Sequence, residues 1–354
     1  MDIGFRWYGR GNDSVSLADI RQIPGTSQIV WALHHKQAGE RWGKEEIREE
    51  VNYIQSHGFK AEVVESVNIH EDIKLGLPSR DDHIDAYIET IRNLGEAGVK
   101  VICYNFMPVF DWIRTDLAKE MEDGSTALFY EKSLVNDVTP EKLVERVLQN
   151  PDFTMPGWEP ERLAHIQQVI KLYEEVTEDD LFDNLQYFLE RVIPVCKEHD
   201  VKLGVHPDDP PWPVFNLPRI VSTHEQLRRI LRLVDSKYNG LTLCSGALGA
   251  LEGNDLPEMI HEFKDRISFA HVRNVYRYPN GDFIETSHRE QDGSVPITDI
   301  IKAYHDIGFE GCIRPDHGRH LWNESCRPGY GLYDRALGIM YMLGIWDERE
   351  KRRD

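Results

Sequence analysis

Residues that could bind a divalent metal lie at the ends of four successive apolar segments. His206, Cys244 and His271 each end such a segment, and Asp316 directly follows the last one. Imidazole, thiolate and carboxylate groups are all ligands of divalent transition metals, and four of them leave coordination positions for water or substrate. One such residue alone is usually structural, but four at successive segment ends favour a shared metal site. The soft thiolate and the imidazoles favour zinc or iron(II) over magnesium.

Groups that could move protons follow these residues. His317 comes directly after Asp316, and a histidine beside a metal-bound carboxylate can act as a general base. It could instead only orient a ligand through a hydrogen bond. Tyr330 lies in the glycine-bracketed string PGYGLYD, where its phenol could reach the site as an acid, whereas Tyr333 is expected to pack against the protein.

The charge of the chain constrains its partners. With 41 Lys and Arg against 61 Asp and Glu, the formal net charge is −20, which argues against nucleic acid or an anionic lipid surface. An anionic small substrate therefore needs a locally positive pocket. Arg273 and Arg319 are the expected source of that charge, and Asn274 is expected to bind substrate with them. Either arginine could instead form an ordinary surface ion pair.

The elements that position these residues alternate along the chain, because short β-branched or aromatic segments are followed by stretches with helical periodicity. We expect eight strands, at residues 3–8, 28–34, 60–66, 99–106, 201–206, 241–244, 267–271 and 311–315. We expect helices at residues 44–57, 80–97, 179–199, 223–236, 255–264, 296–307 and 332–343. This pattern predicts an α/β fold, the (β/α)₈ TIM barrel, in which the carboxyl ends of the strands converge on one face.

The whole chain, residues 1–354, is expected to form a single TIM-barrel domain, since no linker or low-complexity segment divides it. Residues 111–178 are too long for a simple loop and predict a mostly helical insertion after the fourth strand, near the barrel mouth. No G-x-G-x-x-G string follows a strand, so a dinucleotide site is not supported. The pairs His34-His35 and Asp208-Asp209 are minor candidates for substrate contacts.

The composition is that of a globular protein, with 40% hydrophobic and 29% charged residues. The five cysteines are odd in number, widely spaced and never arranged as C-x-x-C, so they predict neither a disulfide framework nor a zinc ribbon. The N-terminus lacks a signal-peptide pattern, and no apolar stretch reaches the ~18 residues of a membrane span. We therefore expect a cytoplasmic protein with no membrane partner.

The sequence also contains several long and unusual strings. They are FRWYG, VESVNIHEDIKLGLPSRDDHI, VICYNFMPVFDWIRTDL, GVHPDDPP, LCSGALG, AHVRN, IRPDHGR and PGYGLYDRALG. Over nearly the whole chain these strings resemble the metal-dependent D-mannonate dehydratase family. The resemblance implies a xylose-isomerase-like TIM barrel that eliminates water from D-mannonate to give 2-keto-3-deoxy-D-gluconate in hexuronate catabolism.

Site residues and cofactor follow from the same resemblance. The metal ligands of the family fall on His206, Cys244, His271 and Asp316, and its catalytic histidine falls on His317. Its catalytic tyrosine falls on Tyr330, with Tyr333 close by in the same string. The resemblance implies manganese (Mn2+) as the metal, with iron (Fe2+) or cobalt (Co2+) as alternatives, and a homodimer. We expect His317 to be the base and Tyr330 the acid, although the sequence leaves these two roles interchangeable.

Other functions stay open at this point. A metal-dependent sugar isomerase or hydrolase could use the same barrel, because a fold does not decide the chemistry. The thiolate of Cys244 counts against an isomerase, since isomerases of this architecture prefer carboxylate-dominated metal sites. A non-catalytic sugar-acid-binding protein is the other alternative, and the intact set of candidate ligands, with the His317 and Tyr330 pair, counts against it.

Overall fold

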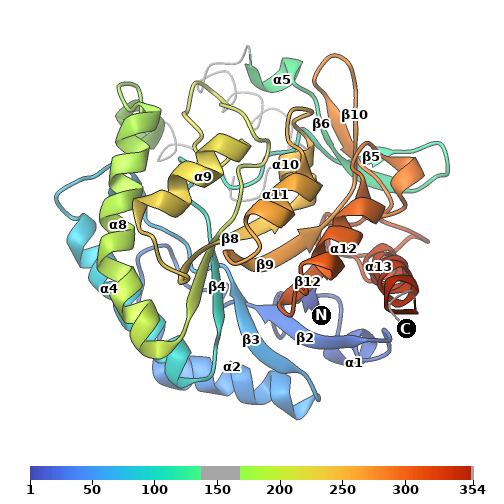
Figure 1. Ribbon diagram of the computed structural model, residues 1–354, viewed down its shortest axis with the longest axis horizontal. Helices are drawn as coiled ribbons and strands as arrows, with labels where there is room; N and C mark the ends of the chain where they lie inside the picture. The colour runs from blue at the N-terminus through green and yellow to red at the C-terminus, as the bar shows by residue number, and fades with distance from the viewer. Residues whose placement is uncertain (137–167, 352–354) are drawn as a thin grey trace.

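The computed structural model describes residues 1–136 and 168–351, and a closed barrel of parallel strands forms its centre (Figure 1). In chain order the barrel strands are β1 (Asp2–Arg6), β2 (Thr26–Trp31), β3 (Lys60–Glu65), β4 (Val101–Tyr104), β7 (Lys202–Val205), β8 (Asn239–Cys244), β9 (Ile267–Val272) and β12 (Cys312–Pro315). Each strand pairs with the one before and after it in this series, and β12 closes the ring against β1. All eight predicted strands are present, and the predicted TIM barrel is confirmed.

The inside of the barrel is filled by side chains. One apolar cluster, separate from the larger one that joins strands and helices, is drawn from five of the barrel strands. Its members are Val30, Val63, Val101, Cys103, Phe269 and Cys312. Alternate residues of a barrel strand point inward, so these side chains fill the barrel interior and leave no open channel along its axis. The polar residues at the carboxyl ends of the strands therefore lie above an apolar floor.

The seven predicted helices are all present in the structure. They are α2 (Lys44–Ser56), α4 (Arg80–Glu96), α8 (Glu178–His199), α9 (His224–Leu233), α11 (Leu256–Glu262), α12 (Ile297–Asp306) and α13 (Tyr333–Lys351). Shorter helices are α1 (Leu17–Ile20), α3 (Glu71–Lys74), α5 (Ser133–Asn136), α10 (Ser245–Gly249) and the 3₁₀ helix η1 (Glu290–Asp292). The long helix α8 begins with a capping box, in which Thr177 and Asp180 satisfy each other's backbone N–H groups. Within the described ranges, none of the helices combines the length and apolar character needed to cross a membrane.

A second sheet was not predicted. It contains β5 (Asp116–Glu120), β6 (Thr126–Tyr130), β10 (Val275–Arg277) and β11 (Phe283–Glu285). These strands are antiparallel, in the order β10, β11, β6, β5. The expectation of a mostly helical insertion at residues 111–178 is therefore wrong for its first part, which forms β5 and β6, while residues 137–167 lie outside the described residues. The strands are short, and β6 obtains its partner β11 from a distant part of the chain, so local sequence pattern did not reveal them.

Candidate metal centre and catalytic site

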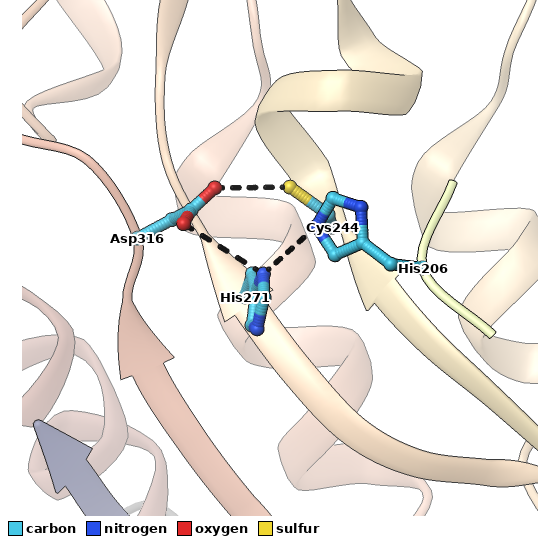
Figure 2. Close-up of side chains that lie close together, drawn as sticks. All are labelled: His206, Cys244, His271 and Asp316. Atoms are coloured by element: carbon cyan, nitrogen blue, oxygen red, sulfur yellow. Dashed lines mark hydrogen bonds and ion pairs between the residues drawn. The ribbon is translucent and has the colours of Figure 1, made fainter. Parts of the chain in front are cut away.

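The structure brings the four predicted metal ligands together at the carboxyl end of the barrel (Figure 2). One donor atom each of His206, Cys244, His271 and Asp316 lies within 4.8 Å of the others. Cys244 Sγ is 3.2 Å from Asp316 Oδ2, His206 Nε2 is 3.2 Å from His271 Nδ1, and that nitrogen is 3.8 Å from Asp316 Oδ1. The four residues lie at the carboxyl ends of the adjacent strands β7, β8, β9 and β12, with His271 one residue before the end of β9. The parallel direction of these strands brings their ends together.

The hydrogen bonds around these residues fit a bound divalent cation. His206 Nδ1 is 2.7 Å from the carbonyl oxygen of Pro207, which can only accept, so the lone pair of His206 resides on Nε2 and faces the other donors. His271 Nε2 lies 3.1 Å from Arg314 Nε and 3.4 Å from Glu65 Oε2. With a metal on Nδ1, this Nε2 would carry the proton and donate it to Glu65, the carboxylate–imidazole arrangement that orients metal-binding histidines. Two imidazoles, a thiolate and a carboxylate form a suitable donor set for a transition metal.

Charged groups beside the cluster keep Asp316 ionised. Arg314 Nη2 is 2.9 Å from Asp316 Oδ1 and also 2.7 Å from Glu65 Oε1. Burial alone would raise the pKa of Asp316, but His317, Arg314 and Arg273 lower it well below its ordinary value. Asp316 is thus a carboxylate, the form that binds metals. The sequence does not predict that Glu65 and Arg314 contact the candidate ligands, because only the fold brings them next to Asp316 and His271.

Next to the candidate ligands, hydrogen bonds join Glu285, His317 and Tyr330 into a chain. Glu285 Oε1 is 2.8 Å from His317 Nδ1, and His317 Nε2 is 3.0 Å from the hydroxyl of Tyr330. Because a carboxylate only accepts, His317 carries its proton on Nδ1, and its Nε2 accepts from the phenol. Tyr330 is 5% exposed, whereas Tyr333 begins α13, is 42% exposed and contacts Trp322. The geometry therefore selects Tyr330 over Tyr333 as the partner of His317.

The protonation states in this chain suit proton transfer. Burial, helped by Tyr8 and Asp316, raises the pKa of Tyr330 well above its ordinary value, so the phenol keeps its proton. Burial would also raise the pKa of Glu285, but His317 and two arginines lower it to about 2. Glu285 stays ionised and holds His317 in the tautomer whose Nε2 is unprotonated and faces the Tyr330 hydroxyl.

Glu285 belongs to a buried network of two arginines and two carboxylates. Arg114 lies 2.8 Å from both Glu285 Oε1 and Asp209 Oδ1, and Arg273 lies 2.8 Å from Asp209 Oδ2. Arg273 Nε also lies 3.0 Å from Asp316 Oδ2, which links the network to the candidate metal ligands. Arg114 precedes β5 and Glu285 ends β11, so the unpredicted sheet positions this network.

We expect Arg114→Met to lower the free energy of unfolding by about 1–3 kcal/mol, because Asp209 and Glu285 would each lose one of two buried cationic partners and keep only Arg273. Glu285 stabilises the wild type fully above its ordinary pKa of 4.5, and this contribution is lost as the pH falls toward about 2. The variant should lose less between these pH values. Urea unfolding across this pH range measures both effects, with the exposed Arg10→Met as control. Equal stability of Arg114→Met and the control at neutral pH would contradict the prediction.

A cavity of about 550 Å³ opens beside the donor atoms and the hydrogen-bonded chain. One side of its wall includes His206, Asp316, His317 and Tyr330. The other side comes from the ends of the remaining strands β1, β2, β3 and β4, and includes Arg6, Tyr8, His34, Lys36, Ser66, Asn68, Asn105 and Asp111. One half of the barrel thus carries the candidate ligands, and the other half carries polar side chains that line the same cavity.

The three residues expected to bind substrate do not line this cavity. Arg273 is fully buried and paired with carboxylates, as described above. Arg319 lies 2.9 Å from Asp334 and 3.0 Å from Asp123, and the Asn274 side chain bonds to backbone groups of a neighbouring segment. Their assignment to substrate binding stays a prediction, and these contacts favour structural and positioning roles.

The minor candidates for substrate contacts are separated by the fold. His34 lines the cavity, and Asp209 lines it while pairing with Arg114 and Arg273. His35 lies 3.0 Å from Glu46 on an exposed surface. Asp208 is fully buried and accepts hydrogen bonds from the loop that follows β7, including Ser222 Oγ at 2.8 Å. Of these four residues, His34 and Asp209 are therefore the two that can contact a molecule in the cavity.

Comparison with known proteins gives consistent similarities over the whole chain. Residues 1–354 match the sequence profile of the family described as D-mannonate dehydratase (UxuA). The chain is 64% identical over 347 residues to mannonate dehydratase 1 of Halalkalibacterium halodurans, covering 98% of this chain and 96% of that protein. It is 55% identical over 350 residues to the mannonate dehydratase of Bacillus subtilis, with coverage of 99% and 98%.

Solved structures give the same picture. The crystal structure of mannonate dehydratase from Streptococcus suis serotype 2 superimposes with a TM-score of 0.89 at 39% identity, covering 100% of this chain and 96% of that one. A xylose isomerase domain protein from Planctomyces limnophilus gives a TM-score of 0.55 at 11% identity, with coverage of 98% and 97%. The second similarity concerns only the barrel fold.

Proposed function

The chain belongs to the D-mannonate dehydratase family and is a hydro-lyase, and from this premise we propose that it removes water from D-mannonate to give 2-keto-3-deoxy-D-gluconate in hexuronate catabolism. The observation that carries this proposal is the hydrogen-bonded chain of Glu285, His317 and Tyr330 beside the four potential metal ligands. His317 and Tyr330 of this chain line the same cavity as the ligands His206 and Asp316. A dehydration beside a carboxylate needs a base for the α-proton, an acid for the leaving hydroxyl, and stabilisation of negative charge.

We assign the base to His317 and the acid to Tyr330. His317 Nε2 takes the proton from C2, the C2–H electrons form the C2–C3 double bond, and the hydroxyl on C3 leaves with the Tyr330 proton as water. The resulting enol becomes the 2-keto product. Each of the two groups contributes on the order of 10²–10⁴-fold to the rate. The reverse assignment would need Tyr330 to be a phenolate before the reaction, whereas its raised pKa keeps the phenol protonated until it donates to the leaving group.

The hydrogen bond between the two groups explains how they recover their starting state. After the elimination, His317 carries the C2 proton on Nε2, and Tyr330 is a phenolate. The 3.0 Å separation lets this proton pass directly from imidazole to phenolate. Glu285 stabilises the imidazolium in the meantime, as the buried carboxylate does in other acid–base triads.

We propose that His206, Cys244, His271 and Asp316 hold manganese (Mn2+), with iron (Fe2+) or cobalt (Co2+) as alternatives. A bound divalent cation would supply Lewis-acid stabilisation for the charge that develops on the substrate carboxylate. The family resemblance supports manganese, whereas the soft Cys244 thiolate supports iron(II). The resemblance also supports a homodimer, and the odd, widely spaced cysteines support a cytoplasmic location.

Incubation of the manganese-loaded protein with D-mannonate tests this function. We expect the formation of a 2-keto-3-deoxy acid, its loss when a chelator removes the metal, and its return when Mn2+ is added back. The product is measured by a colorimetric assay for 2-keto-3-deoxy acids and by mass, because dehydration removes one water from the substrate. Isomerisation without loss of water would instead indicate a sugar isomerase, and binding without any reaction would indicate a sugar-acid-binding protein.

A further inference from the structure

Arg6, the last residue of β1, is a buried cation whose hydrogen bonds go to uncharged groups. Its side chain lines the cavity, and the residue is only 5% exposed. Arg6 Nη1 donates to the Val30 carbonyl oxygen at 3.3 Å, and Nη2 lies 3.5 Å from His34 Nε2. No carboxylate of residues 1–136 or 168–351 forms an ion pair with this guanidinium. Glu65, whose pKa Arg6 helps to lower, directs its two oxygens at Arg314.

The other buried arginines of the described ranges are all well partnered. Arg114, Arg219, Arg273 and Arg314 each pair with at least one carboxylate. Arg335 donates to three backbone carbonyl oxygens. Arg335, like Arg6, has no ion pair with a carboxylate of the described residues, but its three nitrogens all have carbonyl acceptors, whereas Arg6 has one carbonyl acceptor and a long contact to His34. Because an incompletely partnered buried charge is costly, a bound anion would compensate Arg6.

A second cation lies close to Arg6. Its neighbour Tyr8 has the Arg6 guanidinium 4.7 Å from its ring centroid and the Arg327 guanidinium 4.4 Å from the same centroid. Arg327 also lines the cavity and donates to Asn12 Oδ1 at 3.0 Å. Burial and these two arginines lower the pKa of His34 to about 2, so His34 is neutral and the positive charge of this region comes from the two arginines. The two guanidinium groups repel each other, and an anion bound between them would offset this repulsion.

The position of this positive region relates it to catalysis. The ring of Tyr8 meets the ring of Tyr330 edge-on, with centroids 4.8 Å apart. An anion held by Arg6 and Arg327 would therefore lie beside the proposed catalytic acid. In the proposed reaction, the carboxylate is bonded to C2, and the leaving hydroxyl is one carbon further along, so the two groups must lie close together.

We propose that Arg6, assisted by Arg327, binds the carboxylate of the substrate and makes the site select a sugar acid over a neutral polyol. This inference rests on the proposed function for the identity of the acid. Arg6 and Arg327 then supply the local positive charge expected from Arg273 and Arg319, because carboxylates of the protein already neutralise those two arginines. The planar guanidinium of Arg6 can form two parallel hydrogen bonds to a carboxylate.

Binding measured in a catalytically blocked background tests the inference apart from turnover. The manganese-loaded variants His317→Asn and His317→Asn/Arg6→Gln are titrated calorimetrically with D-mannonate and with D-mannitol, which has a hydroxymethyl group in place of the carboxylate. We expect Arg6→Gln to weaken D-mannonate binding about 10–100-fold and to change D-mannitol binding less than about threefold. Arg6→Lys should recover part of the loss, because it restores the charge but not the two parallel donors.

The control removes an arginine of the same segment that does not line the cavity. Arg10 is exposed and paired with Glu49, so Arg10→Gln in the same background should bind D-mannonate normally. Equal weakening of both ligands by Arg6→Gln, unchanged D-mannonate affinity, or no D-mannonate binding to His317→Asn would each overturn the inference. If D-mannonate binds through Arg6 but the wild type never dehydrates it, the proposed function fails and the carboxylate subsite stands.

Discussion

Replacing His317 with asparagine should leave the protein folded and able to bind metal, but should reduce the turnover of D-mannonate on the order of 10²–10⁴-fold. Asparagine retains a polar side chain of similar reach, yet it cannot take the C2 proton at neutral pH. The loss should appear in kcat, because His317 acts on the reacting atoms. Steady-state kinetics together with metal analysis of the same preparation measure both properties.

The tyrosine pair offers a matched control for this experiment. Tyr330→Phe removes the hydroxyl that lies 3.0 Å from His317 Nε2 and should also lose turnover while keeping metal. Tyr333→Phe removes the same group from an exposed residue three positions later and should remain close to wild type. Near-normal activity of His317→Asn would contradict the assignment of the base, and inactivity of Tyr333→Phe alone would contradict the assignment of the acid.

Replacing Cys244 with alanine should remove the metal itself. The thiolate is one of the four candidate donors. Mutation of residues that only hydrogen-bond to metal ligands typically weakens metal binding 10–100-fold, so we expect the loss of a ligand to weaken Mn2+ binding by at least ~100-fold. Turnover should fall with metal content and recover only in part at high Mn2+. Equilibrium dialysis of the metal-free protein against Mn2+ gives the affinity directly.

Cys103 provides the corresponding control. It is also fully buried, but it lies on β4 in the apolar cluster that fills the barrel. Burial raises the pKa of its thiol well above the ordinary value, so it remains a neutral thiol. Cys103→Ala should therefore keep wild-type metal affinity. If Cys244→Ala bound Mn2+ as tightly as the wild type, Cys244 could not be a ligand.

The barrel was predictable from the sequence because each of its strands is a compact apolar segment followed by a helix. Segments such as 267–271 are buried on both faces and read the same way in the sequence and in the structure. The strands β5, β6, β10 and β11 lack this signal, because they are short and pair with distant partners. The sequence pattern therefore predicts a mostly helical insertion at residues 111–178, although this range contains β5 and β6.

The candidate ligands were predictable for a related reason. The barrel brings strand ends together, so His206, Cys244, His271 and Asp316 could be expected to meet before their distances were known. The role of an arginine depends instead on its partners. The acidic partners of Arg273 come from other strands and loops, and only the fold shows that no carboxylate in the described part of the chain pairs with Arg6.

Titration of the metal-free protein with Co2+, followed by absorption spectroscopy, tests most directly whether these four side chains bind one cation. We predict saturation at a single Co2+ per chain, with a near-ultraviolet charge-transfer band from the Cys244 thiolate that is absent in Cys244→Ala and present in Cys103→Ala. Saturation without a thiolate band in the wild type, or the same band in Cys244→Ala, would show that the cation binds elsewhere.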